Sequence, residues 1–154
     1  MKRRIFLKGS MAVSALGVAL GAGLLTPTTV LAAWPDKAFH AKKMPEALTA
    51  MFGSDAVEES GDVTIDAPEI AENGNEVPVK VITSIKDVES ITIYADKNPS
   101  PMVATYNLTD KCHGFVSTRI RMGKTANVIG VVKAGGKLYS GKKEVKVTVG
   151  GCGG

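Results

Sequence analysis

The most nucleophilic side chain of this sequence stands almost at its C-terminal end. Cys152 is flanked by Gly150 and Gly151 on one side and by Gly153 and Gly154 on the other. Because glycine has the largest conformational entropy to lose on ordering, we expect these residues to form a flexible arm. Nearly straight, at about 3.3–3.6 Å per residue, such an arm reaches on the order of 15 Å from the folded body. Its thiol can then enter a narrow cleft of another protein while the domain stays outside.

The residues around this thiol provide no means of activating it. An unperturbed thiol has a pKa near ~8.5, and a cation, a helix N-terminus or a metal is needed to lower that pKa. Within six positions upstream of Cys152, Lys146 is the one basic residue, and the terminal carboxylate lies close by. We therefore expect the arm to be inert on its own and to be activated by whichever protein accepts it.

A second cysteine, Cys112, lies next to His113, as a nucleophile and its base would. Successive side chains of a strand point to opposite faces, so adjacency does not bring the two into hydrogen-bond reach. We expect neither a catalytic dyad nor a metal site built on His40 and His113. The main expectation for Cys112 is a buried or partly buried bystander. A disulfide to Cys152, a redox or intermolecular role, and a disulfide between two Cys152 arms are the alternatives.

Two further features bear on enzymes and partners. The sequence lacks a C-x-x-C pair, an H-E-x-x-H helix and a phosphate-binding glycine loop, which are motifs of common enzyme classes. Arg119 and Arg121 share one face of a predicted strand, with Ser117 beside them. A solvated sheet face is the simplest interpretation, and a partner surface is the alternative, because arginine is enriched in interface cores.

Residues 1–32 have the three parts of an export signal: a basic start (MKRRIFLK), an apolar, glycine-rich stretch, and a small-residue cleavage region (VLAA). The paired arginines resemble a twin-arginine signal, with an ordinary secretion signal as the alternative. We expect cleavage after Ala32 or Ala33 and a periplasmic protein without a membrane anchor. The segment holds four basic residues and no acidic one, which accounts for the net charge of +4. The mature domain is then formally neutral, so we do not expect it to bind nucleic acid or an anionic membrane.

The rest of the sequence predicts one short helix followed by strands. Between residues 33 and 53, Pro45 and Glu46 suit the first turn of a helix, and Gly53 ends it. After Gly61, apolar and polar residues alternate, which indicates half-buried strands. Turn residues recur at intervals of roughly 8–12 residues, so seven or eight short strands predict an all-β sandwich. We expect strands near 63–66, 77–83, 90–94, 102–108, 116–122, 127–133, 138–139 and 145–149.

The ending KEVKVTVGGCGG, the segment FVSTRIRM about 30 residues before it and the twin-arginine start together resemble the SoxY family. This family comprises the sulfur-carrying subunits of the periplasmic thiosulfate-oxidising Sox system, and the resemblance covers essentially the whole mature chain. It implies an immunoglobulin-like antiparallel β-sandwich of about seven strands over residues 54–149, after a helical segment at 33–53. It also implies a carrier arm at 150–154 whose Cys152 holds sulfur covalently. The expected partner is a second β-sandwich subunit of the SoxZ kind, bound as a heterodimer.

The same resemblance implies how other enzymes use the arm. A haem enzyme joins thiosulfate oxidatively to the sulfur of Cys152, and a hydrolase then releases sulfate and leaves a persulfide. A molybdenum–haem enzyme oxidises that sulfur further, or the sulfur is passed elsewhere. The protein is then the carrier in each step and the catalyst in none, and it needs no cofactor or metal of its own.

Two other functions stay open on the sequence alone. One is a periplasmic β-sandwich binding module whose terminal cysteine only forms an intermolecular disulfide, with the glycines as a linker. The other is a small metal-dependent redox enzyme on the same kind of sandwich, for which the sequence offers few histidine and cysteine ligands.

Overall fold

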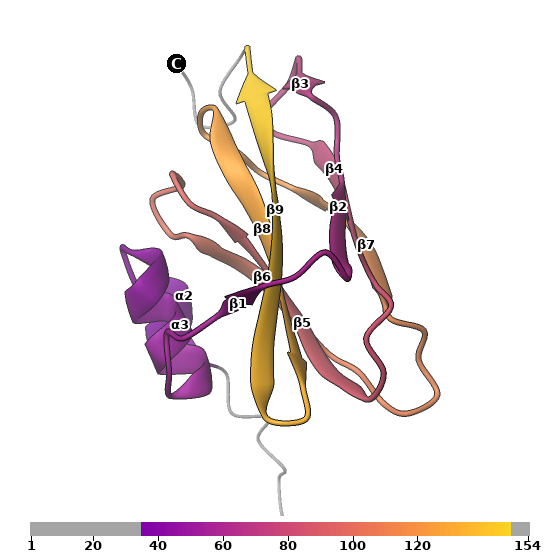
Figure 1. The fold of residues 1–154 in the computed structure, drawn as a ribbon. Coiled ribbons are helices and arrows are strands. Elements are labelled where there is room, and N and C mark those ends of the chain that lie inside the picture. Colours follow the sequence, from indigo (N-terminus) through magenta and orange to yellow (C-terminus); the bar gives the residue numbers. More distant parts are fainter. Residues whose placement is uncertain (1–34, 149–154) are drawn as a thin grey trace, which may run out of the picture. The chain divides into compact units, whose positions relative to one another are not determined.

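The computed structural model describes residues 35–148 of the 154-residue chain. The predicted signal segment and the predicted carrier arm lie outside the described residues. In the described part, two helices precede nine strands (Figure 1). The helices are α2 (Asp36–His40) and α3 (Met44–Phe52). The strands are β1 (Glu58–Glu59), β2 (Val63–Asp66), β3 (Ile70–Ala71), β4 (Val77–Thr83), β5 (Val88–Ala95), β6 (Met102–Asn107), β7 (Phe115–Ile120), β8 (Ala126–Ala134) and β9 (Lys137–Val147).

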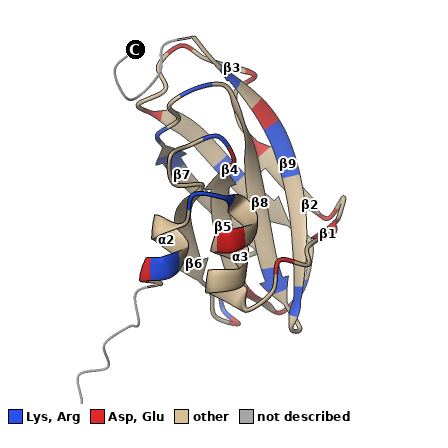
Figure 2. Ribbon diagram, turned by 90° about the vertical axis from the view of Figure 1, so that its left-hand side faces the viewer, with Lys and Arg blue, Asp and Glu red and all other residues tan. Residues whose placement is uncertain are grey.

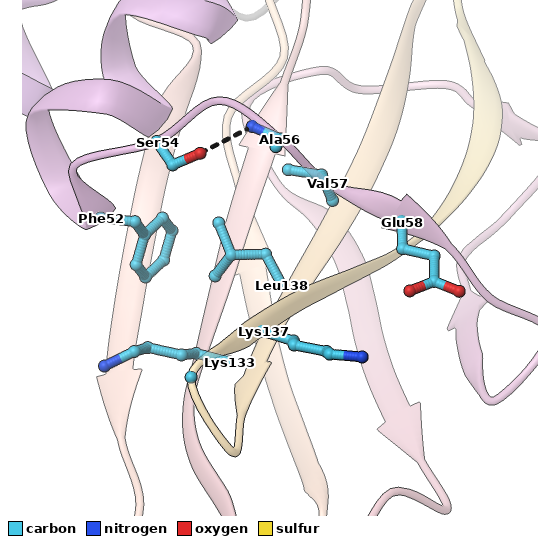
Figure 3. Close-up of a pocket in the computed structure, with 9 residues that line it drawn as sticks. Phe52, Ser54, Ala56, Val57, Glu58, Lys133, Lys137 and Leu138 are labelled. Atoms are coloured by element: carbon cyan, nitrogen blue, oxygen red, sulfur yellow. Dashed lines mark hydrogen bonds between the residues drawn. The ribbon is translucent and has the colours of Figure 1, made fainter.

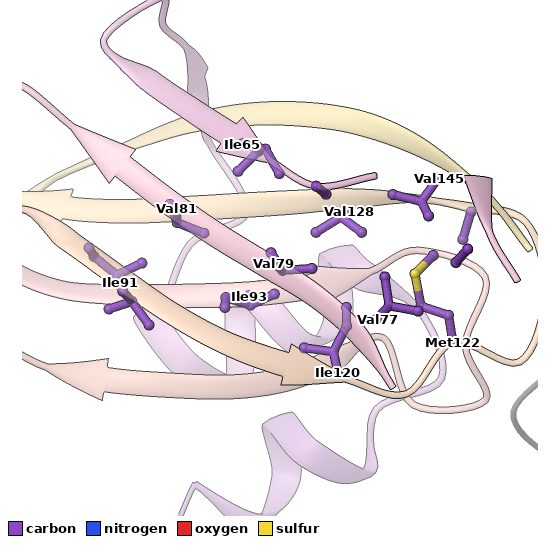
Figure 4. Close-up of a cluster of buried hydrophobic side chains, with 14 of the residues drawn as sticks. Ile65, Val77, Val79, Val81, Ile91, Ile93, Ile120, Met122, Val128 and Val145 are labelled. Atoms are coloured by element: carbon purple, nitrogen blue, oxygen red, sulfur yellow. The ribbon is translucent and has the colours of Figure 1, made fainter. Parts of the chain in front are cut away.

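The strands form two sheets whose inner faces share one core. The larger sheet has the order β1-β9-β8-β5-β6, with β3 also paired to β9, and the smaller has the order β2-β4-β7. Neighbouring strands are antiparallel except for the two-residue strands β1 and β3, which run parallel to β9. Side chains of both sheets meet in a buried cluster that includes Ile65, Val81, Ile93 and Val128 (Figure 4). The prediction of an immunoglobulin-like β-sandwich is therefore confirmed.

The alternation of apolar and polar residues explains which side of each strand faces this core. Along β4, Val77, Val79 and Val81 are buried, whereas Pro78 and Ile82 face solvent. Successive side chains of a strand point to opposite faces, so this pattern buries one face only. Strand β8 lies between β5 and β9 and is buried along most of its length. Its near-continuous apolar run is typical of a strand covered on both faces.

The two helices cover part of the outer face of the larger sheet (Figure 1). Leu48 of α3 packs in a second buried cluster with Tyr94 of β5 and Leu138 of β9. Proline in the first turn fits the start of α3, and Gly53 ends the helix with a left-handed φ of 78°. The Gly53 N–H donates to the Thr49 carbonyl at 2.9 Å. The predicted helix and its end are confirmed, and α2 is an additional helix within the predicted helical segment.

The last two predicted strands form a single strand, β9, because the glycine between them does not make a turn. Gly141 lies opposite Gly130 of β8, on the inner face of the larger sheet. A β-carbon at Gly141 would overlap the carbonyl oxygen of Val63 in β2. Glycine is required here by the close approach of the two sheets. The prediction of separate strands at 138–139 and 145–149 is therefore wrong, as is the extension of β7 beyond Ile120.

Candidate functional site

The predicted attachment site follows the C-terminal end of β9. Five predicted site residues lie outside the described part of the chain: Cys152, Gly150, Gly151, Gly153 and Gly154. The structure does place the residues that lead to them, because β9 ends at Val147 and Thr148 is the last described residue. The geometry of this end decides where the predicted arm begins.

The end of β9 continues beyond its main partner strand. The pairing of β8 with β9 begins at Ala126 and Val145, so the next residues of β9 have no opposite residue in β8. Strand β3 pairs with these residues instead, and it runs parallel to Lys146 and Val147. The chain is thus held by the fold up to the arrowhead of β9 in Figure 1.

Cys112 lies in the loop between β6 and β7, and its side chain is exposed. The expectation of a buried or partly buried bystander is therefore wrong. The loop turns tightly at this point, because the Cys112 N–H donates to the Thr109 carbonyl at 2.9 Å, and turns of this kind run over the surface. The Thr109 hydroxyl lies 3.5 Å from Cys112 Sγ. Hydrogen bonds from the Thr109 side chain, and then from its backbone, lower the pKa of the Cys112 thiol.

In the described part of the chain, the adjacent His113 ring makes no hydrogen bond to this thiol. Among the described residues, the hydrogen-bond partner of Cys112 Sγ is Thr109 and not the His113 ring. His40 lies on a different element, at the end of α2, where its Nδ1 is 2.9 Å from the Asp36 carbonyl oxygen. Within residues 35–148, no three His, Cys, Asp or Glu side chains are grouped closely enough to hold a metal ion.

The Cys112 loop and the end of β9 lie at opposite ends of the sandwich (Figure 1). Gly114, two residues after Cys112, accepts a hydrogen bond from the Thr83 N–H at 2.7 Å. Thr83 pairs with Val63 of β2, and the Val63 carbonyl packs against Gly141 of β9. The Cys112 loop is therefore level with Gly141, in the first half of β9.

This placement argues against a disulfide between Cys112 and Cys152. From Gly141 to Thr148 the chain advances roughly 23 Å, at about 3.3 Å per residue. The four residues from Thr148 to Cys152 reach at most about 14 Å, and the α-carbons of a disulfide lie within about 7 Å of each other. Strands β2 and β4 add a sideways separation, because they lie between β7 and β9. A bridge within one folded chain would require the backbone to move.

The two arginines of the predicted strand face have different surroundings. Arg119 lies on β7, and its guanidinium is 2.7 Å from Glu76 Oε1, with both side chains largely exposed. Arg121 follows the end of β7, and its carbonyl oxygen accepts a hydrogen bond from Asn98 Nδ2 at 2.8 Å. They therefore do not form one strand face. Figure 2 shows acidic and basic residues interspersed along β9 rather than separated.

A hollow beside the β8–β9 turn lies at the other end of β9 from Thr148 (Figure 3). Phe52 and Leu138 form apolar walls, and Lys133 and Lys137 are among its charged lining residues. The ammonium of Lys133 is paired with Glu89 at 2.6 Å. The described residues that line this hollow include neither cysteine nor histidine.

Sequence reasoning missed two surface features. Strand β3 has only two residues, which is too short for a periodic pattern. Ile82 and Phe115 form an exposed cross-strand pair on the outer face of the smaller sheet, and 41% and 52% of their respective surfaces are accessible. The sequence did contain a signal for Phe115, because it alternates with Ser117 and Arg119 on the polar side of its strand.

The comparisons with known proteins identify the family. The family model described as "Sulfur oxidation protein SoxY" matches residues 48–152. The chain belongs to the SoxY family. The match begins within α3, includes both sheets and has Cys152 as its last residue. The predicted carrier cysteine therefore lies inside the length that the SoxY model describes.

A solved SoxY structure is similar to this one. The sulfur carrier protein SoxY from Chlorobium limicola f thiosulfatophilum is 50% identical, and the match covers 70% of this chain and 97% of that protein with a TM-score of 0.63. The search of the curated proteins gave no match. The SoxY resemblance in the sequence is thus confirmed. Among the helices of residues 35–148, none is sufficiently long and apolar to cross a membrane.

Proposed function

We propose that this SoxY protein carries sulfur intermediates covalently on Cys152 during the oxidation of sulfur compounds, with residues 150–154 as its carrier arm. The family match that ends on Cys152 is the observation that carries the proposal. The similar Chlorobium protein is described as a sulfur carrier. The anchored end of β9 also supports it, since the strand leads directly into the glycine-rich segment.

The first proposed step is an oxidative coupling. The Cys152 thiol loses its proton, and its sulfur forms an S–S bond with the outer sulfur of thiosulfate. The electron pair released passes to a haem enzyme of the Sox system, and the product is a cysteine S-thiosulfonate.

Hydrolysis then releases the oxidised sulfur. A hydrolase directs water to the sulfone sulfur and breaks its bond to the sulfane sulfur, which yields sulfate, a proton and a persulfide on Cys152. This step transfers no electrons. A molybdenum–haem enzyme then oxidises the persulfide sulfur, with water as the source of oxygen, or the sulfur passes to another acceptor.

The chain takes part in these steps as a substrate carrier and not as a catalyst. The sequence near Cys152 offers no group that lowers its pKa, so the accepting enzyme provides the activation. We further propose that the protein is exported by its twin-arginine signal to the periplasm and pairs with a SoxZ-like subunit. The exposed Ile82 and Phe115 are apolar surface of the kind that protein partners cover.

Reconstitution tests the proposed function. The purified chain with its SoxZ-like partner is incubated with thiosulfate and the haem enzyme, and the C-terminal peptide is analysed by mass spectrometry. We expect a thiosulfonate adduct in the unaltered protein and in Cys112→Ser, and none in Cys152→Ser. An adduct that persists in Cys152→Ser, or a disulfide dimer as the only product, would overturn the proposal.

A further inference from the structure

We propose that β3 and Thr125 clamp the root of the carrier arm, and that the clamp makes Thr148 the fixed point from which Cys152 reaches other enzymes. The arm root is defined here as Lys146, Val147 and Thr148. The inference rests on the proposed function, because it assigns positioning residues to the carrier arm.

Every backbone N–H of the arm root has an acceptor, although β8 no longer lies opposite. The amides donate alternately to the two sides of the strand, as expected for an extended chain held at both edges. The hydrogen bonds are Lys146 N–H to Glu69 O (2.9 Å), Val147 N–H to Thr125 Oγ1 (3.0 Å) and Thr148 N–H to Ala71 O (3.1 Å). The Thr125 hydroxyl thus replaces the backbone acceptor that a longer β8 would supply.

Among the strands of residues 35–148, β3 pairs with β9 alone, and it does so only at the arm root. The core, and not the arm, holds β3 in place. Ala71 is 6% exposed and belongs to the buried cluster between the sheets. Shortly after β3, the Gly74 carbonyl accepts a hydrogen bond from the N–H of the fully buried Met122 at 2.7 Å. The arm root is therefore fastened to a segment that is itself anchored.

Thr148 is fastened by its side chain as well as by its backbone. Its hydroxyl lies 3.2 Å from the Glu72 carbonyl oxygen and 3.4 Å from that of Ala71, and it donates toward both. Thr148 is exposed, so burial does not account for its attachment. Serine retains this donor at position 148, and valine keeps the shape of threonine without the donor.

The clamp sets the number of residues between the last held residue and Cys152. From Thr148, the four residues to Cys152 reach about 14 Å; from Val145, the last residue paired with β8, seven residues would reach about 25 Å. The effective concentration of a tethered group falls roughly as the −3/2 power of tether length. Release of the arm root is thus expected to lower the local concentration of the Cys152 thiol at an adjacent enzyme by about twofold.

Amide exchange tests the clamp without any partner enzyme. NMR on the full chain compares the unaltered protein with Thr125→Val and Thr125→Ser. We expect the Val147 amide to exchange about tenfold faster in Thr125→Val, since it loses its acceptor, and to be protected again in Thr125→Ser. The Val132 amide, in the central strand, serves as the folding control. Exchange of Val147 at an unstructured rate in the unaltered protein, or no change in Thr125→Val, would overturn the clamp.

Transfer kinetics then test its effect on the carrier. The double variant Thr125→Val/Thr148→Val is compared with Thr125→Ser/Thr148→Ser in the reconstituted reaction. We expect kcat/KM to fall about twofold in the valine pair, with kcat little changed, and to recover in the serine pair. Deleting Gly150 should impair the unaltered protein and partly restore the valine pair. Equal kcat/KM values for the valine and serine double variants would contradict the proposal that the clamp limits how far Cys152 extends. So would an equal effect of the Gly150 deletion on the unaltered protein and on the valine double variant. If the unaltered protein forms no adduct on Cys152, the proposed function fails, while the exchange data still decide the clamp.

Discussion

Replacing Gly141 by alanine is expected to destabilise the sandwich strongly. A β-carbon at this position would overlap the carbonyl oxygen of Val63. The obstacle is backbone, so it cannot rotate away, and β2 or β9 must shift. Overpacking of a core typically costs about 1–3 kcal/mol and occasionally more. Because a strand has to move, we expect the free energy of unfolding to fall by at least about 3 kcal/mol.

Two other glycines provide matched controls. A β-carbon at Gly130 would lie 2.8 Å from Ile65 Cδ1 and 2.8 Å from Val81 Cγ1. These obstacles are side-chain atoms and not backbone, and the contacts are longer than at Gly141, so Gly130→Ala should cost less, about 1–2 kcal/mol. A β-carbon at Gly61 would meet nothing within 4 Å. Gly61→Ala should therefore leave stability unchanged or raise it by up to about 1 kcal/mol, through the unfolded state.

Thermal and urea unfolding of the purified domain measure this series. For a domain of roughly one hundred residues, 1 kcal/mol corresponds to about 4–8 °C in Tm, so Gly141→Ala should lower Tm by about 12 °C or more. A Tm for Gly141→Ala within a few degrees of that for Gly61→Ala would refute the reasoning. So would a smaller loss than in Gly130→Ala, because it would mean that the two sheets do not approach at this point.

Three further predictions concern individual side chains. The buried Tyr94 hydroxyl has no hydrogen-bond partner among the described residues, and burying such a group without a partner costs about 1–3 kcal/mol of stability. Tyr94→Phe should therefore leave the free energy of unfolding unchanged or raise it. A clear loss of stability in urea unfolding would count against this. Thr109→Ala removes the side-chain hydrogen bond, the largest of the causes that lower the pKa of Cys112, and keeps the backbone one. In a Cys152→Ser background, alkylation of Cys112 near neutral pH should therefore slow with the thiolate fraction. An unchanged rate would contradict the assignment. A hydrogen bond from Lys133 lowers the pKa of Glu89 below its ordinary value of 4.5. This pair therefore stabilises the fold at pH values above 4.5, and its contribution is lost as the pH falls through the lowered pKa. Lys133→Met should raise the Glu89 pKa in an NMR titration, and an unshifted curve would show that the pair is not formed.

The sequence predicted those features of the fold that depend only on neighbouring residues, such as the end of a helix or the buried face of a strand. Gly53 ends α3 as expected, and the valines of β4 alternate inward as their spacing indicates. The continuity of β9 was missed because Gly141 is explained only by the approach of β2, which is distant in the sequence. The exposure of Cys112 was missed for a related reason, since a loop's distance from the core depends on how the strands pair.

For the candidate site too, the sequence predicted what local residues decide and missed what long-range contacts decide. The role of Cys152 was inferred from its glycine neighbours and the resemblance to SoxY, both of which are readable in the sequence. The clamp could not be inferred from the sequence, because Thr125 and Val147 are 22 residues apart and meet only when β8 and β9 adopt their register. A two-residue strand such as β3 has no periodicity of its own. Long-range contacts of this kind require the assembled sheet.

The intact mass of the mature protein from cells grown on thiosulfate, measured with and without a reductant, tests the central claim most directly. The account predicts adducts with the mass of sulfur or thiosulfate on the C-terminal peptide that contains Cys152, and their removal by the reductant. A free thiol at Cys152, or only a disulfide dimer joined through it, would contradict the carrier function and favour a terminal cysteine that serves as a cross-link.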